Sequence, residues 1–371
     1  MFRPDLVLYF GAIEDLRDGR ASQALAARYP GAIRLGCSTG TQVAGDRLDD
    51  TGASALVIGL ERTRLRLATH HLAAGESHAA GIAIGVQLAA ADLAGIFLLC
   101  DGLAVNGSAL VAGLVASVGP KVVISGGLAA DGPRFAHTLV ATDGNPAANV
   151  VAAVGFFGNA IHLAHGSAGG WDGFGPTRRI TRADGNILRE LDGKPALDLY
   201  ERYLGEEAAG LPASALLYPL NIWNPAHPGD STVRTVLSID PADGSRVFAG
   251  DMPQGWSARL MRGSFERLND GASDAARHAL RSFADRGITP ELCLFVSCVG
   301  RRLLLGQRAE DEVRAVVDVL GEAVPISGFY SYGEIAPQNV SGFCGLHNQT
   351  VTLTASRASM TRLAIPLATR Y

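Results

Sequence analysis

Residues 121–131, KVVISGGLAAD, form an apolar run that ends in a glycine corner, and residues 324–335, VPISGFYSYGEI, repeat the same design. Each run follows a segment with helical periodicity and precedes another apolar run. Short apolar runs bounded by glycine are typical of buried strands, because glycine accepts the sharp turns that other residues disfavour. The two stretches therefore predict equivalent strand ends in a repeated strand-helix-strand unit.

The same order of segments occurs three times along the chain. One copy spans residues 5–60, the second spans residues 95–157, and the third spans residues 292–355. Repeated units of this kind predict an α/β fold, in which helices pack on mixed sheets. We expect two α/β halves, an N-terminal domain of residues 1–164 and a C-terminal domain of residues 165–371.

The composition indicates a globular protein with more than one hydrophobic core. The chain has 371 residues, of which 47% are hydrophobic and 18% are charged, whereas a single domain usually contains about 100 to 200 residues. The net charge is −4, so no overall positive field is available to attract a phosphate backbone. Nucleic acid is therefore disfavoured as a partner.

Targeting and membrane signals are weak. The N-terminus shows no charged leader followed by a long apolar stretch, so we expect a cytoplasmic protein. The most apolar segment, residues 79–100, carries Gln87 and Asp92 near its middle, which predicts a helix and a buried strand and no membrane span. Five widely spaced cysteines without a CxxC pair predict reduced thiols and no zinc site.

Six separated motifs then follow one another in a fixed order. They are GCSTGTQV (36–43), ISGGLAAD (124–131), LDGKPALDLYERYLG (191–205), VRTVLSID through DMPQGW (233–256), LFVSCVGR (294–301), and PISGFYSYGEIAP through LHNQT (325–350). Together they resemble the N-terminal and C-terminal domains of the FIST family. The resemblance implies an intracellular sensory module that binds small ligands such as amino acids and regulates a signalling enzyme.

A narrower function is implied by the same resemblance. A stand-alone FIST chain is similar to a subset that binds haem, senses nitric oxide and acts through a separate histidine kinase or cyclic-di-nucleotide enzyme. We recognise no output domain in the sequence, and so we expect signalling through such a partner and no turnover by this chain. The identity of the ligand stays open at this point.

The glycine corners supply the candidate ligand contacts. Ser38 and Thr39 offer hydroxyl and backbone donors that suit a carboxylate. Arg301 could clamp an anion, and Glu334 could bind an amine between two tyrosines. For Ser38 and Thr39 a structural turn is the alternative, and for Glu334 a solvated carboxylate in a turn is the alternative. The complete set of candidates is Cys37, Ser38, Thr39, Gly126, Gly127, Cys298, Arg301, Tyr330, Tyr332 and Glu334.

An enzyme is the alternative function. Cys298 or Cys37 would be its nucleophile, but a cysteine nucleophile needs an oriented base, and no neighbouring His and Asp pattern supplies one. For Cys298, simple burial is the alternative to a ligand or catalytic role.

Two histidines are the candidates for a haem iron. His165 precedes a glycine-rich loop, and His347 adjoins the FYSYGE corner, whereas other histidines lie in polar helical segments. A role other than iron ligand is the alternative for both. The absence of CxxCH means that any haem would be held without covalent bonds, and no HExxH pattern suggests a catalytic metal.

Overall fold

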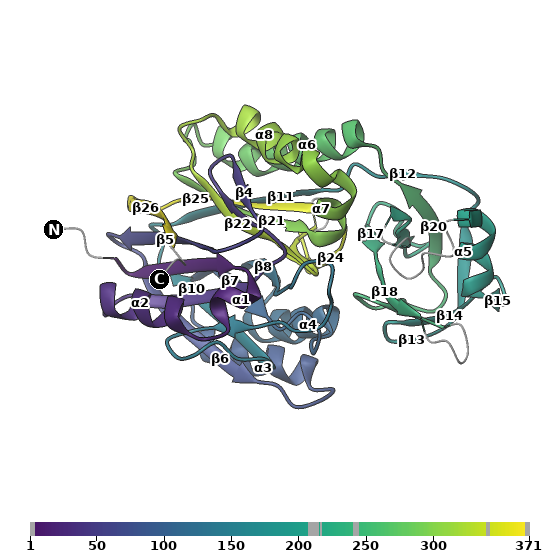
Figure 1. Cartoon of the computed structure of the whole chain (residues 1–371), viewed down its shortest axis with the longest axis horizontal. Helices are drawn as coiled ribbons and strands as arrows, with labels where there is room; N and C mark the ends of the chain where they lie inside the picture. The colour runs from purple at the N-terminus through teal and green to yellow at the C-terminus, as the bar shows by residue number, and fades with distance from the viewer. Residues whose placement is uncertain (1–3, 207–214, 216, 240–244, 339–341, 368–371) are drawn as a thin grey trace.

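A computed structural model describes residues 4–206, 215, 217–239, 245–338 and 342–367. Figure 1 shows a large body of sheets and helices and a smaller body built mainly of strands beside it. The large body contains one five-stranded and two six-stranded sheets, and the smaller body contains a nine-stranded sheet. Within the described residues, no helix combines the length and the apolar character needed to cross a membrane.

The three sequence copies form three structural repeats. In each repeat the first and second strands pair in parallel: β1 (Leu6–Gly11) with β2 (Ile33–Ser38), β7 (Leu93–Cys100) with β8 (Val123–Leu128), and β21 (Leu292–Cys298) with β22 (Ile326–Ser331). A third strand runs antiparallel to the first: β5 (Ala53–Leu60), β10 (Val150–Phe157) and β25 (Val351–Arg357). The α/β fold of repeated strand-helix-strand units is thus confirmed.

Helices connect the parallel strands and cover the outer faces of the sheets. The first repeat uses α1 (Ile13–Leu16) and α2 (Arg20–Arg28), and the second uses α4 (Gly107–Val118). The third uses α7 (Val299–Leu305), the 3-10 turn η3 (Gly306–Arg308) and α8 (Ala309–Leu320). Two further helices, α3 (Ser77–Leu88) and α6 (Phe265–Ala284), pack beside α4 and α8 respectively.

Each repeat also lends strands to the sheets of the other two. After the second strand, β3 (Gln42–Ala44) with β4 (Arg47–Asp49) extends β22, β9 (Val140–Ala141) extends β2, and β23 (Glu334–Pro337) with β24 (Cys344–His347) extends β8. After the third strand, β6 (Arg64–His71) joins β10, β11 (His162–Ala168) joins β25, and β26 (Met360–Leu367) joins β5. The repeats are therefore interlocked. The predicted division between residues 164 and 165 lies inside β11 and stays a prediction.

One glycine recurs at the same place in every repeat. Gly36, Gly126 and Gly328 each lie opposite the first strand, at Tyr9, Leu98 and Phe295. A Cβ on these glycines would lie 2.4, 1.8 and 1.7 Å from the backbone oxygens of those partners. Only glycine permits this approach of two backbones, which explains the glycine corners of the sequence.

The inner faces of the three sheets meet in one apolar core. Leu8, Phe97 and Leu294 come from the first strands of the three repeats, and Phe156 and Phe329 join them. Such burial of large side chains stabilises each repeat only in the presence of the other two.

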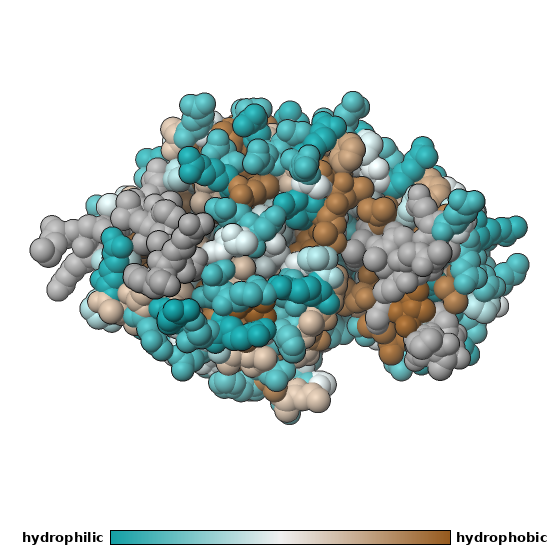
Figure 2. All heavy atoms as spheres, viewed as in Figure 1, coloured by the Kyte–Doolittle hydropathy of each residue, from teal (hydrophilic) through white to brown (hydrophobic). Residues whose placement is uncertain are grey.

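The smaller body is inserted between the second and third repeats. Its elements are β12 (Asp172–Gly173), β13 (Arg178–Asp184), β14 (Ile187–Leu191), β15 (Lys194–Pro195), α5 (Ala196–Leu204), β16 (Leu220–Trp223), β17 (Ser231–Arg234), β18 (Val236–Ile239), β19 (Arg246–Phe248) and β20 (Ser257–Arg262). It has its own core, in which Tyr200 and Phe248 are fully buried. Figure 2 shows hydrophobic atoms on its front face and at its junction with the large body.

Candidate functional site

The ends of strands from all three repeats converge on one cavity of about 620 Å³. The C-terminal ends of parallel strands meet at one edge of a sheet, where α/β proteins commonly bind ligands. Here the connecting turns of the first and second repeats face the start of a helix in the third. The cavity is lined by Ala12, Glu14, Asp15, Thr39, Gly40, Thr41, Asp50, Thr51, Asp131, Gly132, Pro133, Arg134, Val299, Arg302 and Leu303.

One wall of the cavity carries an ion pair between the first and third repeats. Arg302 Nη2 lies 2.9 Å from Asp50 Oδ2, and Arg302 Nε donates to Thr41 Oγ1 at 3.1 Å. The Thr41 hydroxyl donates in turn to Asp50 Oδ1 at 2.6 Å. Asp50 is 59% exposed and Arg302 is 22% exposed, and so this pair faces the solvent inside the cavity.

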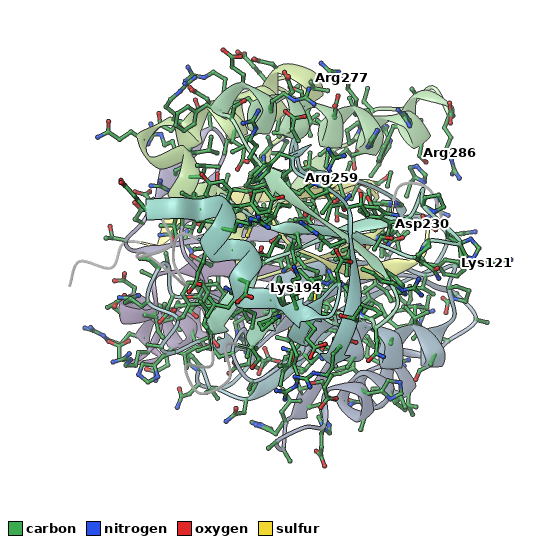
Figure 3. The ribbon with its side chains drawn as sticks, turned by 90° about the vertical axis from the view of Figure 1, so that its right-hand side faces the viewer. Lys121, Lys194, Asp230, Arg259, Arg277 and Arg286 are labelled. Atoms are coloured by element: carbon green, nitrogen blue, oxygen red, sulfur yellow. The ribbon has the colours of Figure 1, made fainter. Side chains whose placement is uncertain are left out.

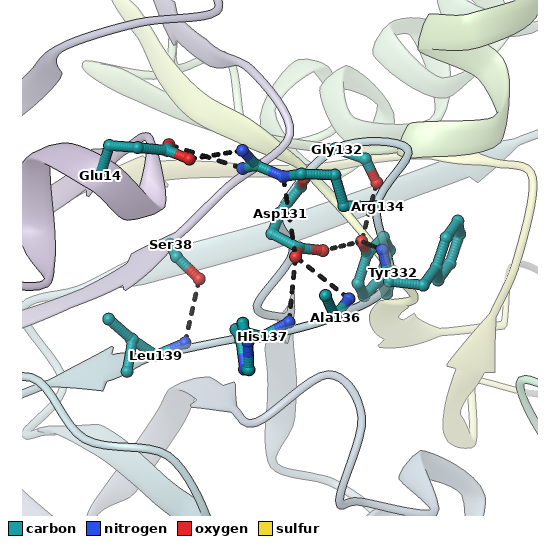
Figure 4. Close-up of polar contacts among 10 residues, drawn as sticks. Glu14, Ser38, Asp131, Gly132, Arg134, Ala136, His137, Leu139 and Tyr332 are labelled. Carbon is teal, nitrogen blue, oxygen red and sulfur yellow. Dashed lines mark hydrogen bonds and ion pairs between the residues drawn. The ribbon is translucent and has the colours of Figure 1, made fainter.

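Another part of the cavity lining carries a second ion pair and a buried carboxylate (Figure 4). Arg134 pairs with Glu14, and both side chains are about half exposed. Asp131 is only 2% exposed, and its Oδ2 accepts the backbone N–H groups of Ala136 and His137 at 3.1 and 3.0 Å. These donors hold the turn after β8 in place, because they bind a carboxylate that water hardly reaches.

Tyr332 of the third repeat holds this turn in place. Its hydroxyl lies against Asp131 Oδ1 and accepts the backbone N–H of Phe135 at 3.0 Å. Its ring stacks on Phe135, with centroids 4.2 Å apart and planes 9° apart. Phe135 has a φ of +50°, a conformation that costs energy for an aromatic residue and needs such support. Burial, followed by the bond to Asp131, raises the pKa of Tyr332 well above its usual range.

The equivalent interface between the first and second repeats contains another cavity, of about 600 Å³. Arg17, Asp101 and Asn149 line it. The Asp101 carboxylate already accepts four hydrogen bonds from protein groups, and so it is less available to a ligand. At the interface between the second and third repeats, the Tyr332 ring packs against the backbone of Gly102. The 620 Å³ cavity is therefore our candidate ligand site.

Several of the predicted contacts lie at or beneath this cavity. Thr39 lines it, and the Ser38 hydroxyl below accepts the backbone N–H of Leu139 at 3.0 Å. Cys37 is fully buried in the central core, where burial raises its pKa well above the usual range. Gly126 and Gly127 lie within β8, where Gly127 pairs with Glu334.

Arg301 and Tyr330 belong to a different, fully buried group. Arg301 Nη2 lies 2.6 Å from Glu312 Oε1, and neither side chain is exposed. The Tyr330 hydroxyl donates to Glu312 Oε2 at 2.7 Å, and Arg301 also donates to the carbonyl oxygens of Gly169 and Leu268. The Arg301 guanidinium, which the sequence suggested as a ligand clamp, therefore already bonds to groups of this chain.

Glu334 and Cys298 lie next to this group. Glu334 Oε2 accepts the backbone N–H and the hydroxyl of Thr350 at 3.1 and 2.8 Å, and Oε1 accepts the Ser331 hydroxyl at 3.1 Å. Burial raises the pKa of Glu334 to about 8. Burial, and then the nearby Glu334, raises the pKa of Cys298 to about 12, and its side chain is almost inaccessible. A buried neutral thiol is a poor nucleophile.

The two candidate haem ligands lie away from the 620 Å³ cavity, which we call the central cavity. His347 lines a cleft of about 210 Å³ between the large and inserted bodies. Pockets for drug-sized ligands measure about 300 to 1,000 Å³. The cleft is smaller than these pockets, and so it does not fit a haem. His165 lies on β11, where burial, followed by the nearby His278, lowers its pKa. Among the described residues, no group of three His, Cys, Asp or Glu side chains could hold a metal ion.

Two family models match successive parts of the chain. Residues 5–194 match the FIST N domain, and residues 196–337 match the FIST C domain. The chain belongs to the FIST family. FIST domains are sensory domains of signalling proteins and bind small ligands.

Other comparisons add little to this FIST assignment. No curated protein matches the chain. A solved cyanuric acid hydrolase from A. caulinodans is 13% identical, with a match that covers 80% of this chain and 99% of that chain at a TM-score of 0.18. At that TM-score the likeness supports no conclusion about this protein.

Several residues of the cavity were not among the sequence candidates, namely Glu14, Asp50, Asp131, Arg134 and Arg302. Asp131 ends the ISGGLAAD motif and Arg302 follows LFVSCVGR, so their motifs were recognised but their roles were not. No local sequence pattern marks Asp50 and Glu14 as site residues, because only folding brings them to the same cavity.

Proposed function

We propose that this FIST chain is an intracellular sensor that binds a small polar ligand in the 620 Å³ cavity and regulates a separate signalling enzyme. The observation that carries the proposal is a single cavity whose walls come from all three repeats. Its volume lies in the range of ligand pockets. A ligand that touches every repeat can influence how they pack, which is the requirement for a sensor.

The charges on the walls favour a ligand with both a carboxylate and an ammonium group, such as a free amino acid. Arg302 and Arg134 supply positive charge to the cavity lining, and Asp50 and Glu14 supply negative charge. In the absence of ligand these groups pair with one another. Exposed pairs contribute only about 0 to 1 kcal/mol, and so a zwitterion can replace them at low cost.

The turn after β8 is the element that would report occupancy. Arg134 lines the cavity, and Asp131 of the same turn contacts Tyr332 of the third repeat. A ligand that draws Arg134 away from Glu14 would pull on this turn and so on the contact between repeats. A partner enzyme that recognises the outer surface of the turn would then respond to the ligand.

We also propose that the chain performs no chemistry of its own. The alternative enzyme needs a reactive cysteine, and Cys298 is buried with a pKa raised to about 12 by burial. Steady product formation by the purified protein, abolished by a cysteine variant, would replace the sensor proposal with the enzyme.

Isothermal titration with the set of free amino acids tests the proposed ligand class. We expect one or a few amino acids to bind, and their amides and deaminated acids, which lack one charge, to bind more weakly. Haem-based nitric oxide sensing through a histidine kinase or cyclic-di-nucleotide enzyme is the narrower alternative. A Soret band after haem addition would support that alternative, whereas no binding by any amino acid would reject the zwitterion.

A further inference from the structure

A second, smaller cleft lies between the inserted body and the large body, away from the central cavity. The turn around Asp230 and the start of β17 form one wall, and His347, Thr350 and Gln338 contribute to the other. In Figure 3, which views the molecule from the inserted body, Asp230 lies toward one side of that body. The cleft measures about 210 Å³, which corresponds to roughly seven water molecules at about 30 Å³ each.

Asp230 is an unusual wall residue. Its Oδ1 is buried and has no hydrogen-bond partner among the residues that the structure describes. Leaving a buried carboxylate oxygen unpaired is costly, since it loses water and gains nothing in exchange. An atom of this kind beside a cleft indicates that a hydrogen-bond donor belongs there.

His347 is the second polar side chain that lines the cleft. Its Nε2 lies 3.0 Å from the carbonyl oxygen of Ala336, and since a carbonyl only accepts, Nε2 carries the proton. Burial lowers the pKa of His347 to about 4, so the ring is neutral near pH 7. In a neutral ring protonated at Nε2, Nδ1 can only accept a hydrogen bond.

The two walls are held together by contacts other than a ligand. Arg234 donates to Leu346 O at 3.0 Å, and Gln338 Nε2 donates to Thr232 Oγ1 at 3.3 Å. The charge of Arg234 lies near His347, but its guanidinium also donates to the carbonyl oxygens of Asp251 and Val233, at 3.1 and 3.3 Å. The cleft is thus preformed, and Asp230 supplies its negative charge.

We propose that this cleft is a second binding site, which takes a small ammonium compound between Asp230 and His347. An ammonium group has three donors and a positive charge, matching one unpaired carboxylate oxygen and one neutral imidazole nitrogen. A metal ion fits less well, because the described residues offer no group of three His, Cys, Asp or Glu ligands. Because the ligand would contact both bodies, its binding would strengthen their association.

Titration calorimetry with ethanolamine and 1,3-diaminopropane tests this site. Acetamide and propan-1-ol serve as uncharged probes of similar size, and Mg²⁺ and Zn²⁺ serve as metal probes. We expect the two amines to bind and to raise the unfolding temperature, and the uncharged probes and metals to have no effect. Equal binding of acetamide, or tighter binding of either metal, would overturn the ammonium assignment.

Variants locate the site. Asp230→Asn and His347→Phe should each weaken amine binding roughly tenfold, the effect of one charge-assisted bond. Asp184→Asn, at an exposed position of the same inserted body, should leave it unchanged. Asp230→Asn should also keep the unfolding temperature close to that of the parent, because Asp230 Oδ1 makes no hydrogen bond to the described residues that the change would break. Unchanged amine affinity in Asp230→Asn would reject the proposal.

The same measurements separate this site from the central cavity. Arg302→Ala should weaken amino-acid binding and leave amine binding unchanged, since Arg302 lines only the central cavity of the two. Loss of amine binding in Arg302→Ala would mean that the amines occupy the central cavity, and the second site would be rejected while the sensor proposal stood.

Discussion

The hydroxyl of Tyr332 lies against the carboxylate of Asp131, 201 residues away in the sequence, and this contact ties the third repeat to the second. Both partners are buried, and the turn that carries Asp131 also lines the central cavity. The contact therefore connects the wall of the candidate ligand site to the packing of the repeats, as a sensory protein requires.

Tyr332→Phe should destabilise the protein by about 1 to 3 kcal/mol, because it leaves the buried Asp131 oxygen without a donor while keeping the ring that stacks on Phe135. Urea unfolding measures this change. Tyr29→Phe is the control, since the Tyr29 hydroxyl makes no hydrogen bond to the described residues. A loss as small as in the control would show that the Tyr332 hydroxyl does not hold the turn.

Arg302→Ala should weaken amino-acid binding by about tenfold or more, the worth of a hydrogen-bonded charge. Its effect on stability should stay small, because Asp50, the partner in the ion pair, is 59% exposed. Arg277→Ala is the control, since Arg277, labelled in Figure 3, forms a surface pair with Asp274 on α6 and lines neither cavity. Calorimetry that finds equal affinities in both variants would remove Arg302 from the site.

Glu334 should make the protein less stable as the pH rises. Its pKa is about 8 in the folded protein, against an ordinary value of 4.5, so the folded state binds a proton that the unfolded state has lost. This contribution is complete below about pH 4.5 and disappears as the pH rises to about 8. Glu334→Gln should remove this dependence, and the exposed control Glu322→Gln should retain it. Parallel stability curves for Glu334→Gln and the parent protein between pH 5 and 8 would contradict the expectation.

Gly328→Ala should destabilise the protein by more than about 3 kcal/mol, because the new Cβ would lie 1.7 Å from the backbone oxygen of Phe295, which cannot move without distorting β21. The control is Gly31→Ala, where no atom lies within 4 Å of the added Cβ. Chemical unfolding or the soluble yield reports the difference. Similar behaviour of the two variants would show that the strands do not approach as closely as described.

Glu312→Gln should cost about 3 to 5 kcal/mol, because it leaves the buried Arg301 charge without its partner. Asp311→Asn is the control, since its pair with Arg308 is exposed. If Arg301 were instead a ligand clamp, the main effect of Glu312→Gln would be on ligand affinity, with stability close to that of the control.

The sequence by itself determined the repeats and their corners. Apolar runs that end in glycine recur three times, and the close approach of two backbones at Gly126 and Gly328 leaves glycine as the residue that fits. This constraint is local, because it involves one strand and its immediate partner. The α/β class and the strands of each unit could therefore be predicted from residue patterns alone.

Only the tertiary structure decided which corners share a cavity and which polar residues are buried. Arg301 and Arg302 are adjacent in the sequence, yet the first is buried in an ion pair with Glu312 and the second faces the cavity beside Asp50. Successive residues of a helix point about 100° apart, and the surroundings of each depend on strands contributed by other repeats. The burial and charge pairing of the site residues thus depend on the exchange of strands among repeats. No short stretch of sequence predicts that exchange.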